Sequence, residues 1–163
     1  MQDRFKFRVW DKEAKKMFTP LRHFNYCNVN GTIVYIESFC QYDGFYQKRI
    51  IKEFNDAILM QCTGLKDKNG KLIYEGDVVR FEEIYECACF TNIKEVLFKI
   101  VWNDYSFKAK QIKIIQGNRS YEFPLTLSKL LEIEPYTEHQ TTINLEIIGN
   151  IYENPELLED GNE

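Results

Sequence analysis

The sequence lacks the long apolar stretch that a membrane-spanning helix requires. No hydrophobic run approaches the roughly 20 residues that cross a bilayer. The first residues, Met1 to Lys6, are mainly polar or charged and contain no signal-peptide core. We therefore expect no membrane contact and a cytoplasmic location.

Motifs that mark common enzymes and metal sites are also lacking. The chain has no Gly-x-Gly-x-x-Gly, P-loop or His-Glu-x-x-His, and its two histidines, His23 and His139, sit in no ligand pattern. Cys87 and Cys89 share one face of a predicted strand, whereas zinc sites usually need Cys-x-x-Cys and a second ligand pair. Five cysteines are an odd number, which favours reduced thiols. We expect no metal and no cofactor.

One pair of carboxylates keeps an enzymatic alternative open. Glu75 and Asp77 are two positions apart and could serve as acid and base. Gly76-Asp77 before a strand is equally well explained by turn chemistry. An enzyme would also need an enclosed pocket with perturbed acids. We expect no catalytic residue and a non-enzymatic protein.

Alanine, the strongest helix former, is scarce, whereas aromatic residues are abundant. Twelve Phe and ten Tyr raise the aromatic share to 15%. Side chains of this kind suit a pleated, half-buried surface. Phe5, Phe7 and Val9 alternate with basic residues, and the stretch from Val96 to Trp102 alternates in the same way. The composition and these patterns predict a mainly β fold.

The order of strand and turn signals predicts three segments. Residues 1–65 form a β-rich N-terminal extension, residues 66–153 a small SH3-like barrel, and residues 154–163 a short helix with a frayed tail. Asn69-Gly70 predicts a tight turn, and Asn154-Pro155 predicts a helix start with Asn as the cap. An apolar stripe favours a short helix over 47–58. Residues 126–133 suit either a helix or a strand.

The alternation also predicts a core. Its expected members are Phe5, Phe7, Val78, Ile100, Trp102 and Ile148. Replacing a buried tryptophan such as Trp102 by alanine would leave a cavity and cost about 3–5 kcal/mol.

Charge is unevenly distributed along the chain. Residues 122–163 contain ten acidic residues and a single basic one, whereas basic residues outnumber acidic ones in residues 1–121. The candidate partner-binding surface consists of Arg4, Lys6, Arg8, Lys108 and Lys110. Basic strand faces with aromatics can bind single-stranded nucleic acid, but these aromatics alternate as core residues do. We therefore favour a protein partner, and strand edges that need covering also suggest a homo-oligomer.

Four segments, in this order, carry a resemblance to a known family. They are FKFRVWDK followed by KKM at 5–17, LMQCTGLKDKNG at 59–70, IYEGDVV at 73–79 and IIGNIYENPELL at 147–158. The chain resembles YopX-type phage and prophage proteins. The resemblance implies a phage or prophage protein in a bacterial host, with an SH3-like barrel and added β structure. It supplies no established biochemical activity and no catalytic residues.

Overall fold

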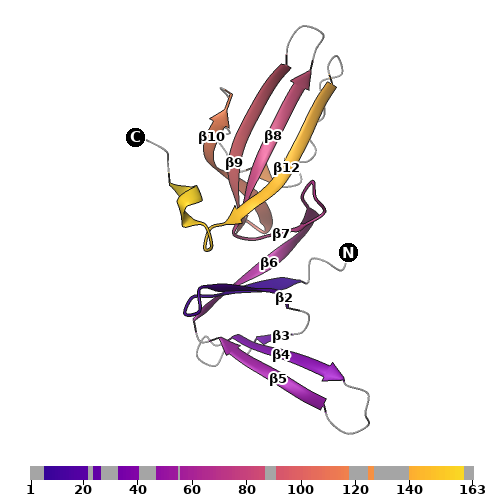
Figure 1. The fold of residues 1–163 in the computed structure, drawn as a ribbon, viewed down its shortest axis with the longest axis vertical. Coiled ribbons are helices and arrows are strands. Elements are labelled where there is room, and N and C mark those ends of the chain that lie inside the picture. Colours follow the sequence, from indigo (N-terminus) through magenta and orange to yellow (C-terminus); the bar gives the residue numbers. More distant parts are fainter. Residues whose placement is uncertain are drawn as a thin grey trace. The chain divides into compact units, whose positions relative to one another are not determined.

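Strands make up most of the chain that the structure describes. The computed structural model describes residues 6–21, 24–26, 33–40, 47–54, 56–86, 91–117, 125–126 and 140–159. The predicted mainly β fold is confirmed (Figure 1). None of the helical segments in these ranges is long and apolar enough to cross a membrane. The chain divides into two compact units, Met1–Cys62 and Thr63–Glu163, while the boundaries predicted at 65 and 153 stay predictions.

The described residues of the first unit form six strands, the last of which continues into the second unit. They are β1 (Phe7–Asp11), β2 (Lys16–Leu21), β3 (Phe24–Tyr26), β4 (Ile33–Cys40), β5 (Gln47–Phe54) and β6 (Ala57–Lys66). β1 pairs antiparallel with both β2 and β6, while β3, β4 and β5 form a separate three-stranded sheet.

The helix predicted over 47–58 is wrong, because β5 pairs with β4 along its whole length. Its apolar residues include Ile50 and Ile51, whose branched Cβ atoms suit strands better than helices. Over so few residues, the spacing of apolar side chains is compatible with a helix and with a strand. The long-range pairing with β4 therefore decides the conformation.

Strand β1 is buried on both faces, which differs from the predicted basic outer face. Val9 is fully buried, and Arg8 and Trp10 are only 6% and 8% exposed, whereas Phe7 is half-buried. β1 is a central strand between β2 and β6. An arginine on a central strand can bury its long apolar stem along its neighbours, so alternation alone did not reveal the second buried face.

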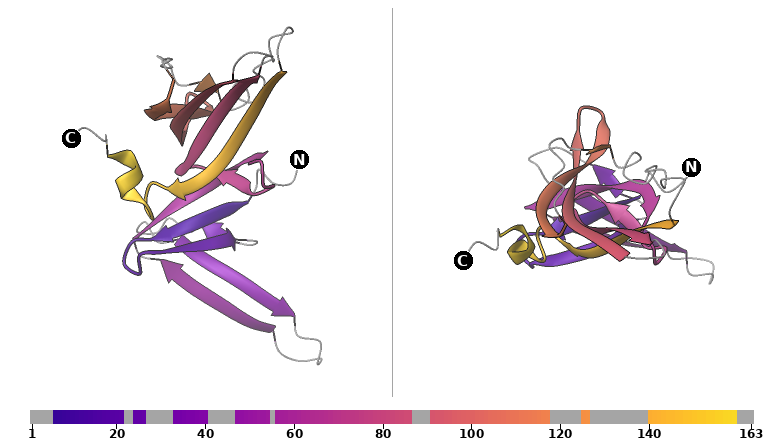
Figure 2. Two further views of the ribbon diagram at one scale, coloured as in Figure 1. Left: turned by 45° about the horizontal axis from the view of Figure 1, so that its top comes forward. Right: turned by 90° about the horizontal axis from the view of Figure 1, so that it is seen from above.

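The second unit is built on a five-stranded antiparallel sheet. The strands of this sheet are β8 (Asp77–Glu86), β9 (Thr91–Asn103), β10 (Ser106–Gln116), β11 (Leu125–Thr126) and β12 (Gln140–Asn150). A short strand, β7 (Leu72–Tyr74), precedes them and pairs with β6 instead. The sheet has the order β11-β10-β9-β8-β12 and curls on itself (Figure 2). Thr126 is therefore in a strand, and 127–133 lie outside the described residues. The finer SH3-like assignment stays a prediction.

The inner face of the curled sheet carries the core of this unit. Directly opposed residues of neighbouring strands point to one face, and Val79, Phe81, Phe98 and Leu145 belong to this inner face. The rings of Phe81 and Phe98 meet edge to face, with centroids 6.1 Å apart. Ile100, which was predicted to be buried, extends the same cluster.

The other predicted core residues have mixed outcomes. Val78 is fully buried, as predicted, whereas Phe7 and Ile148 are half-buried. Phe5 lies outside the described residues. Trp102 is exposed, contrary to the prediction.

The predicted turn at Asn69-Gly70 is confirmed, with Gly70 at a φ of 79°. Asp67 organises it, because its Oδ1 accepts the backbone N–H groups of Asn69 and Lys71 at 2.9 and 2.8 Å. Its Oδ2 accepts the N–H of Ile147 on β12 at 3.3 Å. The turn is thereby attached to the edge of the sheet.

The C-terminal helix is a single 3-10 turn, η2 (Pro155–Leu158), with Pro155 in its first turn as predicted. The predicted side-chain cap by Asn154 is wrong, since that side chain forms no cap hydrogen bond. Its Oδ1 accepts the N–H of Asn150 at 3.3 Å instead. A Cβ at Gly149 would lie 2.6 Å from this oxygen and 2.7 Å from Leu157 Cδ1. Glycine therefore lets η2 lie directly on β12.

Candidate binding surface

The β9–β10 hairpin extends beyond the strand that flanks β9. β8 begins at Asp77, and Val78 is opposite Lys99, so β9 residues after Ile100 have no partner on β8. The Gly76 N–H, in the turn before β8, donates to the Ile100 carbonyl at 2.9 Å and marks this limit. Residues 102–107, here called the hairpin end, therefore form a two-stranded ribbon beyond β8, and Lys108 is the first residue of β10 that pairs with β11.

Trp102 lies on the hairpin end, which explains its exposure. It continues the inner-face alternation of Phe98 and Ile100, but its side chain is 48% exposed because the sheet beside it has ended. Its ring meets that of the directly opposite Phe107, with centroids 4.7 Å apart and planes at 67°. The predicted burial of Trp102 is wrong, and the cavity cost calculated for a buried ring does not apply to it.

The turn that closes the hairpin places a tyrosine in an unfavourable conformation. Asp104 and Tyr105 have φ angles of 47° and 61°, in the left-handed region. Two-residue hairpin turns of this hand prefer Asn or Asp followed by Gly. Tyr105 occupies the glycine-favouring position with its side chain 96% exposed. Backbone strain at a side chain with so little burial is a reason to look for a function there.

The outer face of the same hairpin carries lysines. Lys99 on β9 is directly opposite Lys110 on β10, and like charges in that position destabilise a sheet. Lys108 is two residues from Lys110 and pairs with Asp104. Lys113 is opposite Leu97 on the same face. Within the described ranges, neither Lys99, Lys110 nor Lys113 forms an ion pair.

The residues predicted to form one partner-binding surface belong to both units. Lys6 is half-buried and Arg8 is 6% exposed, and both belong to the first unit. Lys108 and Lys110 lie two residues apart on β10 in the second unit. Arg4 lies outside the described residues. The structure thus brings Lys108 and Lys110 together and leaves little of Arg8 for contact with a partner.

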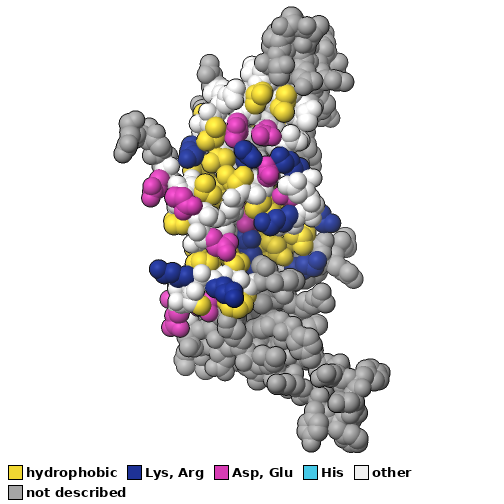
Figure 3. All heavy atoms as spheres, viewed as in Figure 1, with side chains coloured by type: hydrophobic (Ala, Val, Ile, Leu, Met, Phe, Trp, Pro, Cys, Tyr) yellow, Lys and Arg dark blue, Asp and Glu magenta, His cyan; other side chains and the backbone are white. Residues whose placement is uncertain are grey.

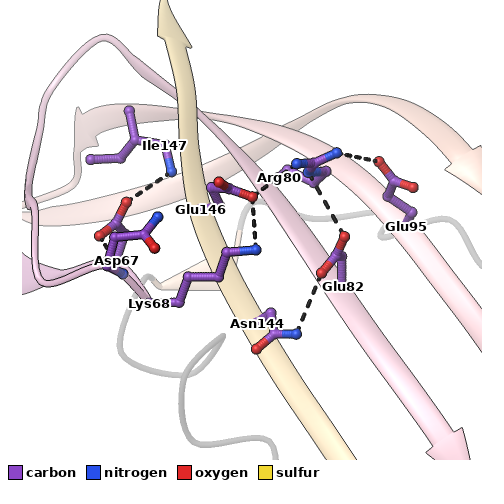
Figure 4. Close-up of polar contacts among 9 residues, drawn as sticks. Asp67, Lys68, Arg80, Glu82, Glu95, Asn144, Glu146 and Ile147 are labelled. Carbon is purple, nitrogen blue, oxygen red and sulfur yellow. Dashed lines mark hydrogen bonds and ion pairs between the residues drawn. The ribbon is translucent and has the colours of Figure 1, made fainter.

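On another part of the outer face, carboxylates of three acidic residues surround the guanidinium of Arg80 (Figure 4). Arg80 is opposite Glu146, to which its Nη2 donates at 2.8 Å, and it lies 3.8 and 3.6 Å from the carboxylates of Glu82 and Glu95. Lys68 also contacts Glu146, at 2.8 Å. Hydrogen bonds from Lys68 and Arg80 lower the pKa of Glu146 to about 2.

The inner face contains a buried ion pair at the end of its core. Glu83 and Lys94 are directly opposed on β8 and β9, and Lys94 Nζ donates to Glu83 Oε2 at 2.8 Å. Their side chains are only 4% and 9% exposed. A Cβ at Gly117 would lie 3.2 Å from Lys94 Cγ, so Gly117 lies against the lysine stem. Sequence reasoning missed this pair, because only the strand register places the two residues together.

Of the two carboxylates that could have served as an acid and base, Glu75 and Asp77, the structure gives Asp77 a structural role. Asp77 is 1% exposed, and its Oδ2 accepts the Tyr74 N–H at 2.7 Å across the turn between β7 and β8. Gly76, at a φ of 78°, completes that turn. Among the described residues, no group of three His, Cys, Asp or Glu side chains could hold a metal ion. Cys87, Cys89 and both histidines lie outside the described residues.

Comparison with known proteins gives a family but no activity. No curated protein matches the chain. A crystal structure of protein EF1440 from Enterococcus faecalis is similar, with 26% identity, a TM-score of 0.46, and coverage of 94% of this chain and 97% of that one. A family model described as YopX protein matches residues 6–159, nearly the whole chain. The chain therefore belongs to the YopX family, as its four sequence segments predicted.

Proposed function

We propose that this protein is a phage- or prophage-encoded, non-enzymatic binding module of the bacterial cytoplasm, and that a protein partner docks on its hairpin end. The observation that carries the proposal is the exposure of Trp102 and Tyr105, at 48% and 96%, on a ribbon that extends beyond the sheet. Tryptophan and tyrosine are the residues that most often dominate the energy of protein interfaces.

The strained turn supports a role for Tyr105 beyond folding. A non-glycine residue in the left-handed conformation costs roughly 1–2 kcal/mol. With its side chain 96% exposed, the ring makes little contact that could offset this cost. Keeping tyrosine at this position therefore favours a contact that forms only when a partner is bound.

The arrangement of the faces favours a protein over single-stranded nucleic acid. Nucleic acid binding of this kind combines stacked aromatics and basic groups along one groove. Here Trp102 and Phe107 are on the inner face of the ribbon, while Lys99, Lys108 and Lys110 are on the outer face. A single strand stacked on the aromatics would not reach the lysines, whereas a protein cleft can enclose the end of a ribbon.

Affinity capture from lysates of phage-infected bacteria tests the proposal. The bait proteins are the tagged wild type, W102A/Y105A and the control I115A, which truncates a side chain exposed to a similar extent, 49%, at the other end of β10. We expect a protein retained by the wild type and by I115A to be depleted about tenfold or more with W102A/Y105A, a loss of about 1.4 kcal/mol or more.

Two outcomes would overturn the proposal. One is that W102A/Y105A, shown by circular dichroism to be folded, retains every protein that the wild type retains. The other is that labelled single-stranded oligonucleotides bind the wild type and are released by W102A/Y105A, because that outcome assigns the aromatic ribbon to nucleic acid.

A further inference from the structure

The outer face of the five-stranded sheet has separate acidic and basic regions. One row of directly opposed residues runs Gly149, Val78, Lys99, Lys110 across β12, β8, β9 and β10. Neighbouring strands are about 4.8 Å apart, so this row spans roughly 14 Å. Its β10 end is basic, and the lysines there have no ion pair with any described residue.

The opposite end of the row is acidic because η2 lies on it. A Cβ at Gly149 would meet Asn154 and Leu157, which places η2 against the outer face at Gly149. Glu156, within this turn, and Glu159, directly after it, are both exposed. Figure 3 shows acidic side chains at the surface in the region where Figure 1 draws η2. Neither forms an ion pair within the part of the chain that is described.

These charges, which have no ion pair among the described residues, contrast with the rest of the sheet. Arg80 has three carboxylates around it, and Lys94 has Glu83. The sheet therefore neutralises Arg80 and Lys94 internally but leaves Lys99 and Lys110 facing each other. Their mutual repulsion would be relieved if carboxylates approached from outside the molecule.

We infer that the outer face binds the outer face of a second copy of this chain through a twofold axis. A twofold contact joins the same patch on both copies, so a residue i that meets j is matched by j meeting i. An axis through the middle of the row brings the two lysines of each copy opposite the acidic end of the other copy. The lysines are Lys99 and Lys110, and the acidic residues are Glu156 and Glu159. Charges that repel within one chain thereby become complementary between two chains.

This inference is independent of the proposed partner, because it uses the face opposite Trp102. Sedimentation equilibrium of the purified full chain measures it without any other protein. At about 0.05 M salt we expect a dimer, and at about 1 M salt, where the Debye length falls to about 3 Å, a weaker one. Both K99E/K110E and E156K/E159K should raise the dimer dissociation constant about tenfold or more.

The charge-swapped variant K99E/K110E/E156K/E159K should restore dimerisation, because each pair regains an opposite charge. The control K66E/K71E reverses two exposed lysines near the turn joining β6 and β7 and should not weaken the dimer. A wild type that stays monomeric at all concentrations would refute the inference. So would a dimer that K99E/K110E leaves intact, a swap that fails to restore it, or a control that weakens it equally.

Discussion

Glu146 on β12 is directly opposite Arg80 on β8, and the Arg80 guanidinium donates a hydrogen bond of 2.8 Å to its carboxylate. Lys68 adds a second contact to this carboxylate at 2.8 Å, so Glu146 joins the turn at residues 66–71 to two strands. These two donors keep the carboxylate charged in the folded state.

The depressed pKa of Glu146 predicts how stability depends on acid. Hydrogen bonds from Lys68 and then Arg80 lower this pKa from 4.5 to about 2. The unfolded chain binds a proton at the higher pH, so the contribution of Glu146 is complete above 4.5 and is lost as the pH falls toward 2. E146Q should flatten the fall in unfolding free energy across this range, measured by urea unfolding at stepped pH. The exposed E153Q is the control, and an unchanged slope in E146Q would contradict the prediction.

The buried Glu83–Lys94 pair predicts strong coupling between two substitutions. Removing one partner leaves an uncompensated buried charge, so E83L and K94M should each lower the unfolding free energy by about 3–5 kcal/mol. The double variant E83L/K94M removes both charges and restores apolar volume, so it should lose much less than the sum of the single variants. Denaturant unfolding measures all three, and additive losses would show that the two side chains act independently.

The close approach of η2 to β12 predicts a cost for any side chain at Gly149. A Cβ there would be 2.6 Å from Asn154 Oδ1 and 2.7 Å from Leu157 Cδ1, so G149A must displace both side chains. We expect a loss of about 1–3 kcal/mol, typical of overpacking. L157A in the same chain removes one of the clashing groups, and G149A should cost less in that background. An equal loss of unfolding free energy in both backgrounds would mean that the contact with Leu157 does not contribute to the cost of G149A.

Much of the β structure could be predicted because it depends on local signals. Asn69-Gly70 marks a turn wherever it occurs, and the alternation from Val96 to Trp102 marks a strand without reference to its neighbours. The β5 segment was mistaken for a helix because its apolar spacing fits both structures, and only pairing with β4 decides between them.

The candidate surface was harder to predict because it depends on where strands end and how they align. Alternation indicates which face Trp102 occupies, but the start of β8 at Asp77 decides that it is exposed. Likewise, the opposition of Lys99 and Lys110 depends on the register of the hairpin. The sequence identified Lys110 as a candidate, whereas Lys99 and Tyr105 became candidates only with the register and the turn conformation.

The hairpin turn predicts a substitution that raises stability. Tyr105 has a φ of 61°, which glycine adopts without the penalty that a Cβ brings. Removing the penalty raises the unfolding free energy by roughly 1–2 kcal/mol. The greater conformational freedom of glycine in the unfolded chain lowers it again by about 0.4–1 kcal/mol. Y105G should therefore raise the unfolding free energy by up to about 1.6 kcal/mol. Y105A, which removes the 96% exposed ring but keeps a Cβ, should leave stability nearly unchanged. Thermal and urea unfolding of both variants separate the two effects. A loss of stability in Y105A would show that the ring holds the turn in place, and the strain would then have a folding role.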